Sequence, residues 1–405
     1  MSNIIKPEIL SPAGNLRTLK VAVDYGADSV YFAGREFGMR AAAANFTTDE
    51  IGEGVRYVHE HGAKAYLTLN TLPRNNDIDR LPNFIRDAAA QGIDAFIVTD
   101  IGVISMCRKY APNTAVHISV QTGIVNYMSA RAYYEMGAER VVLARELSLE
   151  EIAEIRAKTP KELSLEAFAH GAICMAVSGR CLLSSYLTGR DPNRGDCAQP
   201  CRWNYHLVEE KRPGEYMQLI EDKNGSYILN AKDMCMIEHL PEMYKAGVDC
   251  LKLEGRAKTE YYVAAVTNAY ARAAAEFSQT GFDYHPSDEL LEEVMKISHR
   301  EYSTGFYFGQ PKDGQVYGSG GYIRDYELVG VVLSHEDGLT TIAQRNRFYP
   351  GTLDVLDPVF GQFEIESGTL FDKDMNELEC ARYAAEPVKF YSRPLSAGAY
   401  IRVRK

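Results

Sequence analysis

Four cysteines are grouped within a short part of this 405-residue chain, and they carry its most distinctive chemistry. Cys174, Cys181, Cys197 and Cys201 follow the spacing C-x6-C-x15-C-x3-C in a stretch rich in glycine, serine and arginine. Thiolate sulfur is a soft ligand, so four such side chains suit a structural zinc ion or an iron–sulfur cluster. Zinc modules favour two closely spaced cysteine pairs, whereas only one pair is close here. The pattern therefore favours a 4Fe–4S cluster, with zinc as the alternative.

The chain's other four cysteines have weaker claims to a metal role. Cys235 stands at the start of an expected helix and is a reserve candidate for the fourth ligand. Cys107, Cys250 and Cys380 fall in an expected helix, an expected strand and the C-terminal region, where a thiol packs as a small apolar group. Free thiols without a ligand role are the alternative for the first four as well, although their clustering argues against it.

The elements that must position these residues alternate between short apolar segments and amphipathic ones, which is typical of β-α repeats around a parallel sheet. Eight such units fit a (β/α)8, TIM-like barrel. A doubly wound open sheet is the alternative, but it usually stops at about five or six parallel strands. The expected strands are 7–11, 29–32, 63–69, 95–98, 115–118, 140–143, 163–167 and 250–254.

Functional residues of such a barrel lie at the C-terminal ends of its strands. Polar residues in or just after the expected strands include His117, Glu166, Lys252 and Glu254. We expect Glu166, His117 and Glu254 to be catalytic and Lys252 to contact substrate. A satisfied polar group in the barrel mouth is the alternative for each of them.

The domain organisation follows from where this alternation breaks. Residues 168–230 form a Cys-rich insertion inside the expected barrel of residues 1–285, and long insertions of this kind are more often functional than not. Residues 286–327 are expected to be a linker. Residues 328–405 have short strands with frequent turns, which predict a small all-β barrel module.

Composition excludes several classes of protein. The chain has 44 basic and 55 acidic residues and a formal net charge of −11, which argues against a nonspecific nucleic-acid coat protein. It has no apolar run long enough to span a membrane and no secretory-signal pattern, so we expect a cytoplasmic location with no membrane partner. No Gly-x-Ser-x-Gly, His-Glu-x-x-His or Walker motif indicates a common hydrolase or nucleotide site.

Residues 166–184, with the sequence EAFAHGAICMAVSGRCLLS, resemble the signature of peptidase family U-32, the collagenase-like proteins. The segments at 10–15, 117–121, 143–148 and 252–256 are similar to that family as well, so the likeness spans the whole barrel. The C-terminal module resembles the family's accessory domain. The family name implies proteolysis, although the motif contains no accepted catalytic apparatus.

Family members that resemble this chain in length and domain order act in RNA hydroxylation. The resemblance implies formation of 5-hydroxyuridine at the tRNA wobble position, dependent on prephenate and independent of O2. It also implies a 4Fe–4S cluster whose maturation needs the iron–sulfur assembly machinery. Cys174, Cys181 and Cys197 fall on the shared ligand positions, and Cys201 is carried over as the fourth ligand, with Cys235 as its substitute.

The same resemblance suggests how substrates would bind. A small anionic metabolite with two carboxylates, such as prephenate, would be held by arginine forks, for which Arg40, Arg145 and Arg256 are candidates. A tRNA anticodon loop would stack its splayed bases on aromatic or guanidinium planes, and Trp203 is the candidate for that contact. Packing of the insertion on the barrel is the alternative role for Trp203.

Three hypotheses follow from the sequence. The leading one is an iron–sulfur-dependent tRNA uridine hydroxylase. The second is a U-32 peptidase of unassigned catalytic mechanism. The third is a non-catalytic RNA-binding scaffold that holds a structural zinc ion.

Overall fold

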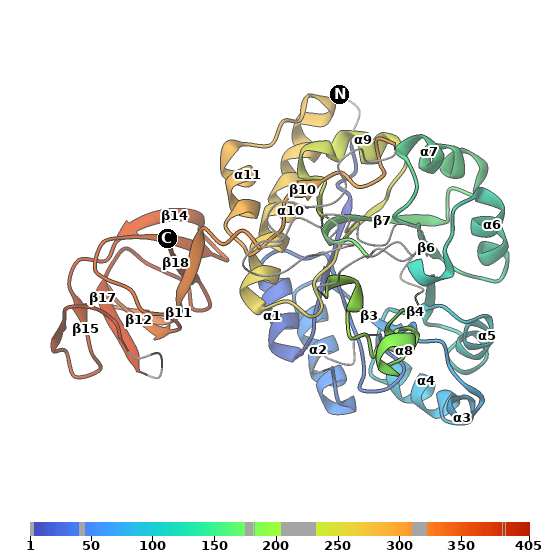
Figure 1. Ribbon diagram of the computed structural model, residues 1–405, viewed down its shortest axis with the longest axis horizontal. Coiled ribbons are helices and arrows are strands. Elements are labelled where there is room, and N and C mark those ends of the chain that lie inside the picture. Colours follow the sequence, from blue (N-terminus) through green and yellow to red (C-terminus); the bar gives the residue numbers. More distant parts are fainter. Residues whose placement is uncertain are drawn as a thin grey trace, which may run out of the picture.

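The computed structural model describes residues 4–39, 45–174, 181, 183–203, 232–309, 322–382, 384 and 386–405. In these residues a parallel barrel precedes an antiparallel β domain (Figure 1). The barrel closes because its last strand pairs with both the first and the seventh. Its eight parallel strands in the described part are β1 (Glu8–Pro12), β2 (Ser29–Phe32), β3 (Lys64–Leu69), β4 (Ala95–Val98), β5 (Ala115–Ile118), β6 (Arg140–Val142), β7 (Ser164–Ala172) and β9 (Cys250–Leu253).

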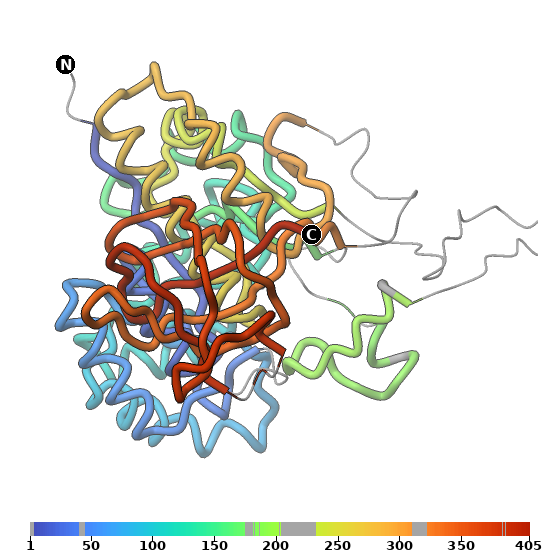
Figure 2. Tube along the Cα trace, turned by 90° about the vertical axis from the view of Figure 1, so that its left-hand side faces the viewer, coloured from blue at the N-terminus to red at the C-terminus, as the bar shows by residue number. Residues whose placement is uncertain are grey.

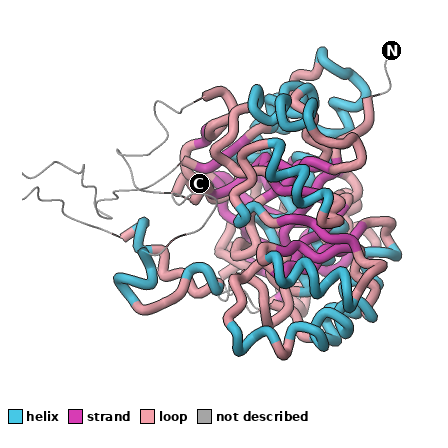
Figure 3. The backbone as a smooth tube through the Cα atoms, turned by 90° about the vertical axis from the view of Figure 1, so that its right-hand side faces the viewer, coloured by secondary structure: helices cyan, strands magenta, loops and turns pink. Residues whose placement is uncertain are grey.

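Helices surround these strands, as a TIM-like barrel requires (Figure 3). All eight expected strands are present, so the barrel prediction is confirmed and the open sheet is excluded. None of the described helices is both long and apolar enough to span a lipid bilayer. The helices of the barrel are α1 (Leu16–Asp24), α2 (Thr48–Glu60), α3 (Asn75–Ile78), α4 (Leu81–Ala90), α5 (Ile101–Tyr110), α6 (Tyr127–Glu135), α7 (Leu149–Lys158), α9 (Leu240–Lys245) and α10 (Glu260–Thr280).

Polar side chains at the loop–helix junctions fix where these helices begin. The Asn15 side chain accepts the backbone N–H of Thr18 at the start of α1. Thr47 and Glu50 form a reciprocal capping box at the start of α2. Such caps satisfy N–H groups that have no partner inside the helix. The loops at the C-terminal ends of the strands therefore have defined exits, which is a condition for a well-ordered site.

The insertion begins later than the sequence suggests, because β7 continues to Ala172 instead of ending near residue 167. Of the expected insertion the structure describes 168–174, 181 and 183–203. The segment 183–203 lies outside the ring of helices at one end of the barrel (Figure 2). It contains α8 (Leu183–Thr188) and two short 3-10 turns, η3 (Pro192–Arg194) and η4 (Pro200–Arg202).

The segment 286–327, expected to be a linker, instead adds to the barrel domain over much of its described length. Helix α11 (Asp288–Met295) packs on α10. Strand β10 (Tyr302–Ser303) pairs with β8 (Asp233–Cys235), which runs antiparallel to the end of β7. Within this segment Tyr307 is buried against the barrel, and its hydroxyl donates to the Phe168 carbonyl at 2.6 Å.

The C-terminal region is all-β, as predicted, and has its own apolar core. Its eight described strands form one antiparallel sheet with the order β14-β13-β18-β11-β12-β17-β15-β16. They are β11 (Tyr326–Glu336), β12 (Leu339–Gln344), β13 (Thr352–Asp357), β14 (Gly361–Glu366), β15 (Leu370–Phe371), β16 (Glu377–Leu378), β17 (Pro387–Tyr391) and β18 (Tyr400–Arg404).

A buried ionic cluster joins the two domains. The Arg402 guanidinium on β18 is fully buried and donates two hydrogen bonds to the Glu293 carboxylate on α11, at 2.6 and 2.5 Å. It also pairs with Asp354 on β13, which is itself paired with Lys296. Each charge in the cluster therefore has an opposite charge across or beside the domain boundary, and a buried charge without such a partner is costly.

We expect Glu293→Gln to lower the free energy of unfolding by about 3 kcal/mol or more, because Arg402 would keep its burial and lose its main partner. Urea denaturation measures this loss. Glu379→Gln is the control, because Glu379 pairs with Arg382 on the surface, and we expect it to change stability by less than about 0.5 kcal/mol. Equal losses in the two variants would contradict a supporting role for the buried cluster.

Candidate functional site

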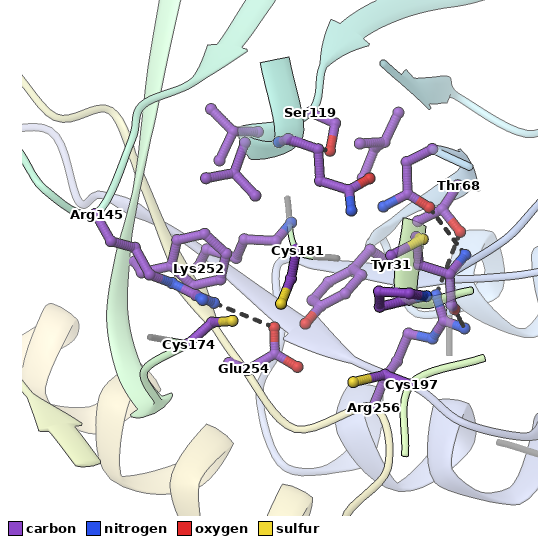
Figure 4. Close-up of a pocket in the computed structure, with 18 of the residues that line it drawn as sticks. Tyr31, Thr68, Ser119, Arg145, Cys174, Cys181, Cys197, Lys252, Glu254 and Arg256 are labelled. Carbon is purple, nitrogen blue, oxygen red and sulfur yellow. Dashed lines mark hydrogen bonds and ion pairs between the residues drawn. The ribbon is translucent and has the colours of Figure 1, made fainter. Parts of the chain in front are cut away.

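A cavity of about 250 Å³ lies at the C-terminal ends of the barrel strands, beneath the insertion. This is the end of the barrel where function is expected. Polar and aromatic residues from strand ends form one part of its wall, and residues of the insertion form the other (Figure 4). The strand-end set includes Tyr31, Thr68, Asn70, Ser119, Gln121, Arg145, Phe168, Lys252, Glu254 and Arg256, and the insertion set includes Cys174, Cys181, Leu183, Pro192, Cys197, Pro200 and Cys201.

All four cysteines singled out by their spacing line this one cavity. None of the four forms a disulfide, and Figure 4 shows the sulfurs of Cys174, Cys181 and Cys197 around the same space. The backbone N–H of Leu183 donates to the Cys181 sulfur at 3.3 Å, and that of Gln199 donates to the Cys197 sulfur at 3.3 Å. Hydrogen bonds of this type stabilise thiolate and tune iron–sulfur clusters.

The arrangement of these donors bears on which metal group they suit. Across the described ranges no three His, Cys, Asp or Glu side chains converge closely enough to hold a single metal ion. The donor set is nevertheless all sulfur, from four cysteines that line one cavity, and two of these sulfurs accept backbone N–H groups. Four cysteine thiolates are the ligands that a 4Fe–4S cluster takes, so the residues present fit that group.

The reserve ligand Cys235 lies elsewhere. It is on β8, where its sulfur is 3.7 Å from the Tyr270 hydroxyl, and it does not line the cavity. Burial raises the pKa of the Cys235 thiol to about 11, which disfavours the thiolate form that metals bind. The structure thus brings Cys201, and not Cys235, to the other three cysteines.

The segment 183–203 is fastened to the barrel by an ion pair. The Arg194 guanidinium on η3 donates to the Asp77 carboxylate on α3 at 2.6 Å, and the Asn193 carbonyl accepts the backbone N–H of Leu72 at 3.2 Å. The Asn193 side chain also bonds both backbone groups of Cys181, at 3.2 and 2.9 Å. Helix α3 follows β3, so these contacts tie the backbone of one cysteine to the mouth of the barrel.

Strands β7 and β9 approach each other very closely beside the cavity. Gly171 has a φ of +110°, and a Cβ built on it would lie 2.6 Å from the Glu254 backbone oxygen. The Glu254 N–H donates to the His170 carbonyl at 2.9 Å. Only glycine fits this backbone and this spacing. The contact fixes the end of β7, which leads to Cys174, against Glu254.

The predicted catalytic residue Glu166 lies one layer below the cavity, in a fully buried position. Its carboxylate accepts from Lys252 at 2.8 Å and from Arg140 at 3.4 Å. Arg140 in turn pairs with Glu8, whose burial opposes ionisation but whose pKa is lowered to about 2 by the hydrogen bonds and charge of Arg140. Glu166 therefore holds the Lys252 ammonium in place at the cavity floor.

The predicted catalytic residue His117 is also inside the barrel and does not line the cavity. Its ring packs edge-on against Tyr66, with the ring centroids 4.7 Å apart. Burial, and then the nearby charge of Arg140, hold the pKa of the imidazole well below its ordinary value. His117 is therefore neutral near pH 7, and any positive charge that acts on a ligand in the cavity must come from other residues.

Three predicted residues do meet at the cavity wall. Arg145 lies over the Phe168 ring, 3.7 Å from its centroid, and pairs with Glu254 at 3.4 Å. Arg256 donates to Thr68 at 3.3 Å and to Asn45 at 3.0 Å, and it also bonds the Met39 carbonyl.

Two predicted substrate contacts remain. Arg40 is outside the described residues, so its position is not assigned. Trp203 follows η4, is 42% exposed and does not line the cavity.

Sequence reasoning missed Asp77, Glu8 and Arg140 as residues that support the site. Glu8 and Arg140 carry a signal, because charged residues within otherwise apolar barrel strands are expensive unless paired. Asp77 carries no such signal, since it resembles an ordinary surface charge until the fold brings it to Arg194. Arg194, in the arginine-rich insertion, is expected from the sequence to offset the charge of the cysteine thiolates, and its pairing with Asp77 does not follow from the sequence.

Family models match almost the whole chain. The one described as Peptidase family U32 matches residues 14–316, and the one described as Peptidase family U32 C-terminal domain matches residues 324–402. The chain belongs to peptidase family U32. The resemblance noted in the Cys174 motif is thereby confirmed. The domain boundary between the two U32 models falls after β10, in agreement with the described fold.

Relatives within U32 carry different names. A Bacillus subtilis tRNA hydroxylation protein P1 is 39% identical over 389 residues, covering 95% of this chain and 92% of the relative. An Escherichia coli tRNA hydroxylation protein P is 37% identical over 401 residues, covering 88% and 87%. An uncharacterised protease of Methanocaldococcus jannaschii is 43% identical over 308 residues, covering 75% and 74%. Membership of U32 alone thus does not decide between RNA hydroxylation and proteolysis.

We expect Asp77→Asn to release the segment 183–203 from the barrel, because Arg194 would lose a charged acceptor that is itself nearly buried. Limited proteolysis should cut the insertion about tenfold faster in this variant. Asp196→Asn is the control, since Asp196 pairs with Arg190 in the same segment but half exposed. Equal cleavage of the two variants would contradict the fastening role.

The same ion pair predicts a pH dependence. The hydrogen bond from Arg194, and then the backbone N–H of Arg74, hold the pKa of Asp77 well below its ordinary value. A lowered pKa stabilises the docked state above the ordinary carboxyl range, and this contribution is lost only as pH falls toward the lowered value. Cleavage of the unmodified protein should therefore be the same at about pH 5 and about pH 7.

Proposed function

We propose that this chain is an iron–sulfur-dependent tRNA-modifying enzyme that hydroxylates the wobble uridine to 5-hydroxyuridine, using prephenate and no O2. The observation that carries the proposal is the cavity that is lined both by four cysteines and by Arg145, Lys252 and Arg256. Relatives named for tRNA hydroxylation at 37 and 39% identity over most of the chain support it.

The cysteines supply the redox part of this function. Cys174, Cys181, Cys197 and Cys201 would hold the 4Fe–4S cluster, which supplies one-electron chemistry when bound. The two N–H donors on the Cys181 and Cys197 sulfurs and the surrounding arginines would offset the negative charge of the thiolate ligands. The iron–sulfur assembly machinery would then be a partner in maturation.

The cationic part of the wall suits an anionic co-substrate. Arg145 lies over the Phe168 ring and Lys252 is held by Glu166, so both cations have partners that position them before a ligand arrives. Positioned guanidinium and ammonium groups are the natural partners of carboxylates. Prephenate, with two carboxylates, has the charge that this wall accepts. Arg256 belongs to the same wall and is held by Thr68 and Asn45.

The RNA would approach over the insertion, where Trp203 is exposed beside η4. A cavity of about 250 Å³ is at the small end of ligand pockets, so it admits a single base out of its stack and excludes a duplex. Trp203 would then stack a neighbouring base of the anticodon loop at the rim. The overall charge of −11 limits such binding to this local site.

Peptidase activity is the second candidate, because a relative at 43% identity is named a protease. Among described residues, no histidine lines the cavity that holds Cys174. His170, the nearest histidine to Cys174 in sequence, is buried among tyrosines, and burial lowers its pKa to about 3. A cysteine–histidine pair of the protease type is therefore not assembled in the described site.

The direct experiment is mass spectrometry of tRNA nucleosides from a strain that lacks the gene and from the same strain carrying it on a plasmid. We expect 5-hydroxyuridine and its derivatives to disappear in the first and return in the second. Their persistence without the gene, in a strain with no second copy, would sink the proposal. Cleavage of a peptide by iron-free protein would favour the peptidase.

Cysteine variants test the cofactor. Protein purified without O2 should hold about four irons per chain and absorb broadly in the visible range. We expect Cys174→Ser and Cys201→Ser each to lose most of this iron and the hydroxylated nucleoside. Cys235→Ser should keep both, because Cys235 lies away from the cavity. Iron loss in Cys235→Ser but not in Cys201→Ser would reverse the ligand assignment.

A further inference from the structure

The cavity has a second, uncharged wall that the proposed function leaves unused. It is formed where β3 and β5 end and consists of two amides, Asn70 and Gln121, beside the hydroxyls of Thr68 and Ser119. Figure 4 shows Thr68 across the space from Arg145 and Lys252, with Arg256 beside it. Arg256 is already bonded to Thr68 and Asn45, so the two amides are the uncharged groups on this side of the ligand space.

The oxygens of both amides are already used by the protein. The Asn70 side-chain oxygen accepts the Met39 backbone N–H at 3.1 Å. The Gln121 side-chain oxygen accepts the Thr99 hydroxyl at 3.4 Å. The Met39 N–H can only donate, so it fixes which way the Asn70 amide faces. The Thr99 hydroxyl also donates to the Asn70 backbone carbonyl at 3.1 Å, so its contact with Gln121 is the weaker of the two. In this arrangement neither NH2 group has a protein acceptor in the part of the chain that the structure describes.

The unused donors are well placed to read a ligand. Gln121 is only 7% exposed, and its backbone is fixed by Ser119, which caps the turn that carries it. A nearly buried side chain that lines a cavity and has an NH2 group without a protein acceptor gains most from a ligand with oxygen acceptors. Since both amides are neutral, they match the carbonyl oxygens of an uncharged ring, whereas carboxylates match the opposite wall.

We propose that Asn70 and Gln121 read the acceptor edge of the target pyrimidine and thereby select uracil over cytosine. This inference rests on the proposed function, because it assumes that the base of an RNA enters the cavity. Uracil presents a carbonyl oxygen at C4, whereas cytosine presents an amino group there. Cytosine would set N–H donors against N–H donors and leave buried groups unpaired, and such mismatches discriminate strongly.

The test is binding of two anticodon stem–loop RNAs that differ only in having U or C at the wobble position. We expect the unmodified protein to bind the U form at least about tenfold more tightly. Gln121→Glu replaces the NH2 donor with an acceptor of nearly the same shape. In this variant the ratio of the two dissociation constants should fall to about one or invert, because the cytosine amino group gains a partner.

The ratio of the two dissociation constants separates a change in base preference from charge repulsion, because repulsion of RNA would weaken the binding of both stem–loops equally. Gln279→Glu is the matched control, because Gln279 is exposed on α10 and its substitution changes the net charge equally. It should leave the preference for U intact. Asn70→Asp is the second variant, and it should reduce the preference even where Gln121→Glu fails to fold. A U preference that survives in folded variants, or that is absent in the unmodified protein, would overturn the assignment.

Prephenate is the probe for the other source of acceptor oxygens. Loss of prephenate binding in Gln121→Glu together with an unchanged U preference would overturn the proposal and assign the amides to the co-substrate. Mass spectrometry of tRNA nucleosides distinguishes a failure of the proposed function from a failure of the role assigned to the two amides. A protein that prefers the U loop but forms no hydroxyuridine would refute the proposed function alone, whereas hydroxylation with unaltered selectivity in Gln121→Glu would refute the role of the amides alone.

Discussion

Charge pairing inside the barrel is the constraint on which the site depends. Four charged side chains are linked by ion pairs across its interior, in the order Glu8, Arg140, Glu166 and Lys252. None of them would be tolerated there alone, because an unpaired ion in a medium of low dielectric is very costly. The last member of this series of ion pairs is the Lys252 ammonium, which reaches the cavity floor. The strands that close the barrel and the cation that faces the ligand are therefore stabilised by the same contacts.

The cavity unites two parts of different physical character. The barrel wall is rigid, since its residues are at the ends of paired strands or lie directly after them. The cysteines come from a long connection whose described part contains only short helical turns, and a few polar contacts hold that part in place, among them Arg194 with Asp77. A group bound between these parts would stabilise their association, because it would add contacts that neither part makes alone.

The barrel could be predicted from the sequence because its signal is repetitive. Eight apolar segments with regular helix ends leave few alternatives, and their bounds differ from the observed strands by a residue or two, apart from the longer β7. The cysteines could be predicted because soft ligands rarely cluster by chance. Their meeting in one cavity agrees with the expectation from their spacing.

Individual roles at the site were less predictable, since they depend on depth along a strand. Glu166 and Lys252 both belong to barrel strands, yet only Lys252 reaches the cavity. His117 points into the barrel among Tyr66 and Arg140. Alternation along a strand predicts which side of the strand a residue faces, but not how far below the cavity it lies. The packing of the segment 286–327 was hard to predict for a related reason, because the burial of an aromatic residue such as Tyr307 does not follow from its sequence neighbours.

The tight approach at Gly171 has a consequence for interpreting sequence variation in proteins of this fold. Any side chain there would strike the backbone at Glu254, so natural selection can reject substitutions on geometric grounds alone. An invariant glycine in the middle of a signature motif is easily taken as a mark of chemistry. At this position invariance would report how closely two strands pass, and comparisons of distant relatives should weigh Cys174 and Gly171 as different kinds of constraint.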